Sequence, residues 1–329
     1  MNAAKRILIA YDGSDYANAA LEDLKRAGLP AETEVLVVTV ADVFLPPGGF
    51  ENTEIPEAVA PAVQKGWDHS ARMVEEARKV AEEGARKIQT DFPDWKVQPD
   101  AFADSPPWGI IRRAGEWKAD LIVAGAHGLH STGRIVLGSL AQLVATQAAC
   151  SVRIVHSKPE EVNSAPRIVI GVDGSAYAYR ALNEVACRNW KKGVAIHLVT
   201  VTDPRVMTAI FSSEKALREF VEKSPEERWA KRLIDHATDK LISRGFTVTS
   251  VNKEGDPKKV LLEEADRWGA DCIFVGARGL SGILHSLIGS VSSSLAARAH
   301  CTVEIVRGVS VPERKEAKAD TGRRLEVKS

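Results

Sequence analysis

Two glycine-rich segments of this 329-residue chain share one spacing, which is typical of loops that hold phosphate groups. Gly125-Ala-His-Gly128 is followed, after nine residues, by Gly138-Ser139. Gly276-Ala-Arg-Gly279 is followed, again after nine residues, by Gly289-Ser290. Glycine permits positive φ angles and a close approach of backbone N–H groups to an anion. Both segments, which read G-x2-G-x9-G-S, therefore predict a phosphate site.

A helix is expected to begin at the second part of each motif, with Leu140 and Val291 in its first turn. The free N–H groups and the dipole of a helix N-terminus favour an anion. Ser139 and Ser290 can add a hydroxyl donor or cap the helix. Two ordinary glycine turns with capping serines remain the alternative, although the residues between the glycines differ between the two motifs.

An acidic residue ends the first strand-like run of each half, Asp12 in one and Asp173 in the other. A carboxylate at this position can bind ribose hydroxyls or a metal ion carried by phosphates. A plain Asp-Gly turn or a helix cap is the alternative, with Ser14 and Ser175 as competing caps. Each aspartate is expected to lie beside a glycine segment, which favours the interpretation that it binds a ligand.

A basic residue lies inside each glycine segment, His127 in the first and Arg278 in the second. A cationic or polar donor at this position fits a phosphate. His127 and His130 would also suit a metal, but their counterparts are Arg278 and Ser281, which are not ligands of the same kind. We therefore expect phosphate contacts here and no metal site.

A duplication positions these motifs along the chain. Residues Ile7–Ser14 match Ile168–Ser175 at a distance of 161 positions, whereas Trp117–Gly125 match Trp268–Gly276 at 151. The first copy therefore carries about ten extra residues, which fall in the proline- and glycine-rich segment 42–61 and predict a loop. The repeat is as long as a domain, so it predicts two tandem domains.

Each half alternates short β-branched runs with helical segments. Apolar runs without polar alternation, such as Ile7–Ala10 and Val35–Val40, predict strands buried on both faces. Alternating strands and helices predict an α/β fold, a doubly wound parallel sheet, in which ligands bind beyond the carboxyl ends of the strands where the strand order reverses. The other elements expected in the first half are strands at 96–98, 121–124 and 152–155 and helices at 17–27, 70–88, 108–116 and 139–147.

Composition excludes several classes of protein. Lysine and arginine total 44, as do aspartate and glutamate, so no broad basic surface for nucleic acid is expected. No run of about 18 apolar residues predicts a membrane helix, and the first residues do not resemble a signal peptide, so we expect a cytoplasmic protein. No cysteine pair has CxxC spacing, so the cysteines are expected to be small buried residues, and the matching tryptophans to pack in the core: Cys150, Cys187, Cys272, Cys301, Trp117 and Trp268.

Taken together, the strand-ending Asp-Gly-Ser, the G-x2-G-x9-G-S loop and the final strand Cys-x-Val-x-Ile-Val resemble the universal stress protein family over about residues 3–157 and 165–307. The resemblance implies two tandem, doubly wound, five-stranded parallel sheets flanked by helices, a Rossmann-like arrangement. It also implies that the chain binds ATP, with or without Mg²⁺. The second half is the closer match, because the first departs from the family pattern at His130 and Ser131.

Positions in the family pattern assign roles to residues of this chain. Asp12 and Asp173 would meet the ribose and phosphate side, and the main chain of Val40 and Val201, which end the second strands, would contact adenine. The remaining predicted nucleotide-binding residues cradle the phosphates or adjoin them: Gly125, His127, Gly128, Gly138, Ser139, Leu140, Gly276, Arg278, Gly279, Gly289, Ser290 and Val291.

The expected organisation is a domain at 1–157, a linker at 158–165, a second domain at 166–308 and a charged, disordered tail at 309–329. Family members pair through their last strands, so a tandem chain can form this pair internally; a further homodimer stays open. The expected function is ATP-dependent regulation of a stress response, with weak ATP hydrolysis at most. An interaction module without nucleotide and a slow ATPase are the alternatives.

Overall fold

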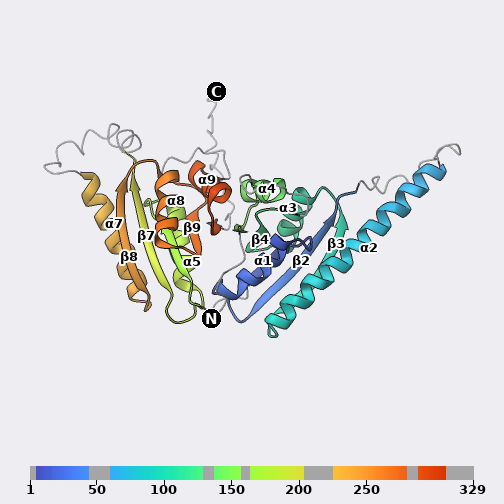
Figure 1. Cartoon of the computed structure of the whole chain (residues 1–329), viewed down its shortest axis with the longest axis horizontal. Helices are drawn as coiled ribbons and strands as arrows, with labels where there is room; N and C mark the ends of the chain where they lie inside the picture. The colour runs from blue at the N-terminus through green and yellow to red at the C-terminus, as the bar shows by residue number, and fades with distance from the viewer. Residues whose placement is uncertain are drawn as a thin grey trace, which may run out of the picture.

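Ten strands form one continuous sheet that runs through both halves of the molecule (Figure 1). The computed structural model describes residues 5–43, 60–128, 137–156, 164–203, 225–279 and 288–308. The strands are β1 (Lys5–Ala10), β2 (Thr33–Ala41), β3 (Lys96–Ala103), β4 (Leu121–Gly125), β5 (Ser151–Val155), β6 (Arg167–Gly171), β7 (Ala195–Thr202), β8 (Thr247–Glu254), β9 (Cys272–Gly276) and β10 (Thr302–Val306).

The strand order is β3-β2-β1-β4-β5-β10-β9-β6-β7-β8. All neighbours are parallel except β5 and β10, which pair antiparallel at the centre. Each half is thus the predicted five-stranded parallel sheet, and the two are joined edge to edge. Since β5 pairs with both β4 and β10, and β10 with both β5 and β9, neither last strand keeps a free edge.

Helices cover both faces of the sheet (Figure 1). Their bounds are α1 (Asp15–Asp23), α2 (Ala60–Asp91), α3 (Pro106–Trp117), α4 (Ser139–Gln147), α5 (Ala176–Cys187), α7 (Pro225–Ile242), α8 (Pro257–Trp268) and α9 (Ser290–Arg298), with a 3-10 turn, η1 (Leu24–Arg26), after α1. Among these described helices, none is both long enough and apolar enough to span a membrane.

The predicted elements of the first half all exist, and their bounds differ where local signals are weak. The helix expected at 70–88 begins ten residues earlier, as α2. Strand β3 is longer than the predicted 96–98 and contains Pro99, which is tolerated because β3 is an edge strand. The predicted loop at 42–61 lies outside the described residues over 44–59, as do 158–163 of the predicted linker and all of the tail at 309–329.

One apolar core spans both halves on the face covered by α3, α4, α8 and α9. Apolar side chains of both central strands contribute to it, among them Ile154 and Val303. The matching tryptophans pack against this core, as predicted. Separate cores fill the opposite face, under α1 and α2 in one half and under α5 and α7 in the other. The cysteine prediction is wrong for Cys187, which is exposed because it closes the last turn of α5 at the surface.

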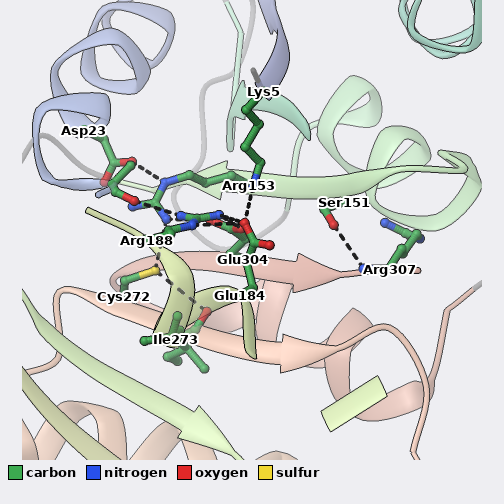
Figure 2. A network of polar contacts seen from close by, with 12 residues as sticks. Lys5, Asp23, Ser151, Arg153, Glu184, Arg188, Cys272, Ile273, Glu304 and Arg307 are labelled. Atoms are coloured by element: carbon green, nitrogen blue, oxygen red, sulfur yellow. Dashed lines mark hydrogen bonds and ion pairs between the residues drawn. The ribbon is translucent and has the colours of Figure 1, made fainter. Parts of the chain in front are cut away.

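A buried network of charges crosses the central strand pair on the face opposite the shared core (Figure 2). Arg153 of β5 lies directly across from Glu304 of β10, and the two are 1% and 0% exposed. The Arg153 guanidinium donates to Asp23 Oδ2 at 2.5 Å and to Glu304 Oε2 at 2.9 Å. Arg188 donates to the other oxygen of Glu304 and also to Glu184 Oε1, the latter at 2.9 Å.

Opposite charges alternate along this network, from Asp23 through Arg153, Glu304 and Arg188 to Glu184, which also binds Lys5. Burial alone would raise the pKa of Glu184, but Arg188 and Lys5 bring it down to about 2. Buried ions are tolerated when each has an opposite charge and hydrogen bonds. The two halves therefore pair through charges as well as through strand hydrogen bonds.

Removing Arg153 is expected to destabilise the whole molecule. Arg153→Ala leaves Asp23 and Glu304 buried with fewer cationic partners, which costs about 3–5 kcal/mol of unfolding free energy. Urea denaturation measures this loss. Arg78→Ala is the control, because Arg78 pairs with Glu75 at 3.5 Å on the surface and should cost below about 1 kcal/mol. Equal losses in the two variants would show that the buried network does not hold the halves together.

Candidate functional site

The strand order reverses between β1 and β4 in the first half and between β6 and β9 in the second. Asp12 follows β1, and the segment that begins at Gly125 follows β4. Asp173 and the segment that begins at Gly276 have the same places after β6 and β9. The structure thus brings each aspartate and its glycine segment to one edge of the sheet, where open α/β sheets bind ligands.

Each aspartate lies so close to its glycine segment that no side chain fits between them. A Cβ on Gly128 would lie 2.8 Å from Asp12 Oδ2, and a Cβ on Gly279 would lie 2.5 Å from Asp173 Oδ2. Real Cβ atoms do not approach other heavy atoms this closely. The backbone of each segment thus lies directly against a carboxylate, an approach that glycine allows without displacing the aspartate.

The first glycine of each segment permits a second close approach. A Cβ on Gly125 would lie 2.8 Å from the Tyr16 carbonyl carbon, and one on Gly276 would lie 2.6 Å from that of Tyr177. The expected positive φ angles do not occur at the motif glycines, since the described glycines with positive φ all lie elsewhere. Gly125 and Gly276 are required because neighbouring backbone leaves no room for a side chain, whereas at Gly128 and Gly279 a side chain would displace the carboxylate. The predicted reason, a positive φ angle, is wrong for these glycines.

The second part of each motif packs onto the first. The N–H group of Gly138 donates to the Ala126 carbonyl at 2.8 Å, and that of Gly289 donates to the Ala277 carbonyl at 2.6 Å. These two glycines are the N-caps of α4 and α9, and neither makes a side-chain cap.

Ser139 and Ser290 therefore do not cap these helices, which corrects the prediction, because each is already the first helical residue. Leu140 and Val291 follow as the second. With glycine as N-cap, no cap side chain competes for the first N–H groups of either helix, and they remain available to an anion.

The helix after each aspartate is capped by the neighbouring serine. Ser14 Oγ accepts from the Ala17 N–H at 3.1 Å, and Ser175 Oγ accepts from the Ala178 N–H at 3.1 Å. Asp12 uses Oδ1 to accept the Ser14 N–H at 3.0 Å, which turns Oδ2 toward Gly128. The structure therefore contains the turn alternative, because Asp173 likewise accepts the Ser175 N–H at 2.9 Å and Gly13 and Gly174 have positive φ angles, whereas the serines and not the aspartates cap the helices. The second carboxylate oxygen of each aspartate still faces its glycine segment.

Val40 of β2 and Val201 of β7 lie at equivalent places, each beyond the end of the first strand of its half. The register of β1 on β2 ends with Ala10 opposite Val38, so Val40 lies two residues farther along. The register of β6 on β7 ends with Gly171 opposite Val199, two residues before Val201. The main chain of both valines therefore continues past the end of the first strand, on the same edge of the sheet as the glycine segments.

The basic residue of each segment packs against a tyrosine of the helix that follows the aspartate, α1 in the first half and α5 in the second. The His127 ring lies 4.9 Å from the Tyr16 ring, and Arg278 Cζ lies 5.7 Å from the centre of the Tyr177 ring. His130 and Ser281 lie outside the described residues. Within the described part of the chain, no group of three or more potential ligands could hold a metal ion.

Comparison with known proteins identifies the family. The sequence profile of the universal stress protein family matches residues 3–156 and again 165–307. The chain belongs to the universal stress protein family. Membership associates it with the response to stress. The double match means that the chain is a tandem member of this family.

Individual relatives agree with this assignment. A universal stress protein of Mycolicibacterium smegmatis is 26% identical over 309 residues, which are 92% of this chain and 96% of that protein. Universal stress protein YxiE of Bacillus subtilis is 24% identical over 147 residues, 43% of this chain and 98% of its own. The crystal structure of a universal stress protein from Archaeoglobus fulgidus shares the fold, with a TM-score of 0.59, 22% identity and coverage of 93% of this chain and 99% of that one.

Two residues near the sites escaped sequence reasoning, His156 directly after β5 and Arg307 directly after β10. They occupy the same place in the two repeats, 151 positions apart. Arg307 donates to the carbonyls of Ala145, in the last turn of α4, and of Cys150, the latter at 3.2 Å. A cation from the second half thus stabilises the C-terminal end of the helix that begins at the glycine motif of the first half.

His156 makes the corresponding contact from the first half, a hydrogen bond with the Ala296 backbone of α9. Burial lowers the pKa of His156 to about 4, and His127 and His300 add to the effect. Its Nε2 atom is shielded from solvent and has no hydrogen-bond partner among the described residues. The ring is therefore neutral at pH 7. In the sequence, His156 and Arg307 are linked by their equivalent positions in the two repeats and not by their side chains, which differ.

A cavity of about 370 Å³ lies at the amino ends of strands from both halves, among the segments that precede β2, β3, β6 and β7. Trp95 and Trp190 line it. It is remote from the glycine motifs, which lie beyond the carboxyl ends of the strands, so it is not the predicted nucleotide site.

His156 is expected to make folding sensitive to mild acid. Its pKa falls from 6.5 to about 4 on folding, so the unfolded chain binds a proton first and stability is lost as pH falls from 6.5 to 4. The loss should reach about 3 kcal/mol for a shift of this size. Urea denaturation across this pH range, compared between the wild type and His156→Gln, isolates the contribution. Parallel stability curves for the two proteins would contradict a neutral, buried His156.

Proposed function

We propose that the chain binds ATP in both halves and regulates a stress response through nucleotide-dependent conformation or partner binding. The observation that carries this proposal is the close approach of Gly128 to Asp12, repeated at Gly279 and Asp173. A glycine backbone held against a strand-ending carboxylate, beside a helix N-terminus, suits a ligand with both phosphates and hydroxyl groups.

Each part of the site has a role in this proposal. The N–H groups at the start of α4 and α9 would hold phosphate oxygens, together with the backbone after β4 and β9. Asp12 and Asp173 would accept hydrogen bonds from the ribose or meet Mg²⁺ carried by the phosphates. The main chain of Val40 and Val201 would pair with the edge of adenine.

We propose binding in preference to hydrolysis. The carboxylates common to both sites, Asp12 and Asp173, would be engaged by the ribose or by Mg²⁺, and the basic position of the glycine segment offers no general base common to both. His127 is the titratable side chain in the first glycine segment, and Arg278 replaces it in the second. A guanidinium stays protonated and cannot take a proton from water. His285, the other histidine of interest in the second half, lies outside the described residues.

The direct experiment is to denature the purified protein, separate any released nucleotide by chromatography and count it against the protein. Close to two ATP per chain supports binding by both halves, and one supports binding by a single half. If nothing is released and neither ATP nor ADP binds in calorimetry, the nucleotide proposal fails and the interaction-module alternative stands.

Alanine at the crowded glycines is expected to weaken ATP binding without unfolding the chain. Neither Gly128 nor Gly279 has a positive φ, so Gly128→Ala and Gly279→Ala are compatible with the backbone, but each new Cβ displaces the carboxylate and narrows the cradle. We expect each variant to lose at least about tenfold in affinity at its own site, or about 1.4 kcal/mol, in calorimetry.

Gly115→Ala is the matched control, because a Cβ at Gly115 in α3 meets nothing within 4 Å. It should keep ATP binding and raise stability by about 0.5–1 kcal/mol. Unchanged ATP affinity in both cradle variants would show that the glycine segments do not form the site.

A further inference from the structure

The two glycine segments lie in different electrostatic surroundings, although the repeat places the same backbone in both. The tyrosine that packs on each segment is conserved between the halves, as Tyr16 and Tyr177. The charged positions around it are not. Three positions of the first half hold one alanine and two histidines where the second half holds three arginines: Ala19, His127 and His156 against Arg180, Arg278 and Arg307.

The three arginines of the second half gather at one place. Arg180 Cζ lies 5.2 Å and Arg278 Cζ 5.7 Å from the centre of the Tyr177 ring. Arg307 lies close enough to interact electrostatically with both Arg278 and Tyr177. Burial and the like charge of Arg278 lower the pKa of Arg307 to about 10, so it stays protonated at pH 7.

The Asp173 carboxylate lies beside Gly279, the residue after Arg278, just as Asp12 lies beside Gly128 in the first half, so it does not distinguish the two sites. The ion pairs of the described part of the chain include none with Arg180, Arg278 or Arg307, and Arg307 instead donates to the carbonyls of Ala145 and Cys150. Close positive charges repel one another, so an anion beside them is stabilised.

The cluster reaches the predicted phosphate site through Arg278. The Arg278 Cα atom lies 3.5 Å from where a Cβ on Gly289 would be, and Gly289 is the N-cap of α9. The Ser175 hydroxyl, which caps α5, donates to the Arg278 carbonyl at 3.3 Å and ties the segment to that helix. Arg278 is therefore part of the backbone that would hold the phosphates of the second site, and Arg180 shares the Tyr177 ring with it.

At the three equivalent described positions, the first half lacks this fixed charge. His156 is neutral at pH 7 because burial lowers its pKa to about 4, and Ala19 carries no charge at all. His127 is 9% exposed and packs against Tyr16 with its ring. The backbone cradle is the same in both halves, so the difference between the sites is chiefly one of charge.

We propose that the second half selects adenine nucleotides by their phosphate charge, whereas the first half binds mono-, di- and triphosphates with similar affinity. This inference rests on the proposed nucleotide binding and adds that the two sites of one chain have different ligand requirements. The second site is filled by ATP. The first site also takes the less charged products of reactions that consume ATP.

Single-site variants of the full chain test this. Gly128→Ala weakens the first site and leaves the second for measurement, and Gly279→Ala does the reverse. Calorimetry with AMP, ADP and ATP, at low and at high salt, gives a series of affinities for each site. At the second site we expect affinity to rise at least about tenfold from AMP to ATP at low salt and this gain to shrink at high salt. At the first site we expect less than about a threefold change.

Exchanging the basic residue tests the cause. Arg278→His in the Gly128→Ala chain should reduce the AMP-to-ATP gain of the second site, and His127→Arg in the Gly279→Ala chain should increase that of the first. Circular dichroism and thermal unfolding confirm that each variant is folded. The unmodified chain gives an independent measurement: at low salt, ATP should titrate in two steps of one per chain, and AMP in a single step.

The outcomes separate this inference from the function on which it rests. Equal affinity series at the two sites, or a gain that does not respond to exchanging the basic residue, would overturn charge selection and leave nucleotide binding intact. Absence of binding for every nucleotide at both sites would overturn the proposed function and this inference with it. A steep, salt-sensitive series at the second site beside a flat one at the first supports it.

Discussion

The architecture depends on the pairing of β5 with β10, where Arg153 faces Glu304 in a place closed to water. A buried charge is tolerated only beside its partner, so this pair fixes the register of the two central strands. A slip of one strand by one residue would turn its ion onto the opposite face of the sheet, among the apolar side chains of the shared core, and would leave the other ion buried without its partner. The same register sets α4 beside α9 and lets Arg307 reach the carbonyl of Ala145. The buried ion pair and the shared apolar core are thus both satisfied by the same alignment of the two halves.

The candidate site of each half lies at the carboxyl ends of its strands. Its position follows from the strand order and from the glycines, which have no side chain. Parallel strands deliver Asp12 and the glycine segment to one end of the sheet, and the reversal of strand order leaves space between their continuations. Gly128 then lets the backbone lie against the carboxylate, because a larger residue would have to displace Asp12. Family membership is established by the sequence match over both halves. The proposed nucleotide binding rests on the glycine geometry.

Much of this could be predicted from the sequence, because the decisive signals are local or repeated. The helix from Ser139 to Gln147 has the predicted bounds, and unbroken apolar runs located the buried strands. Local signals failed where distant groups decide. The folded sheet is needed to show that Pro99 lies in an edge strand. It is also needed to show that neighbouring groups crowd the motif glycines, and that glycine rather than serine is the N-cap of α4. The contacts of Arg307 with Ala145 and of Arg153 with Glu304 join residues more than 150 positions apart, and no short motif records them.

Fusion of the two halves into one polypeptide changes what substitution can achieve at their junction. In an assembly of two identical subunits related by a two-fold axis, every exchange of a residue occurs twice, so a positive charge near the axis meets its own copy. In this chain the equivalent positions 153 and 304 have become arginine and glutamate, opposite in sign and mutually neutralising. Such an oppositely charged pair requires that each half has its own coding sequence, as it has in this duplicated chain. Duplication therefore freed each half to evolve on its own while the covalent link kept the two in equal number.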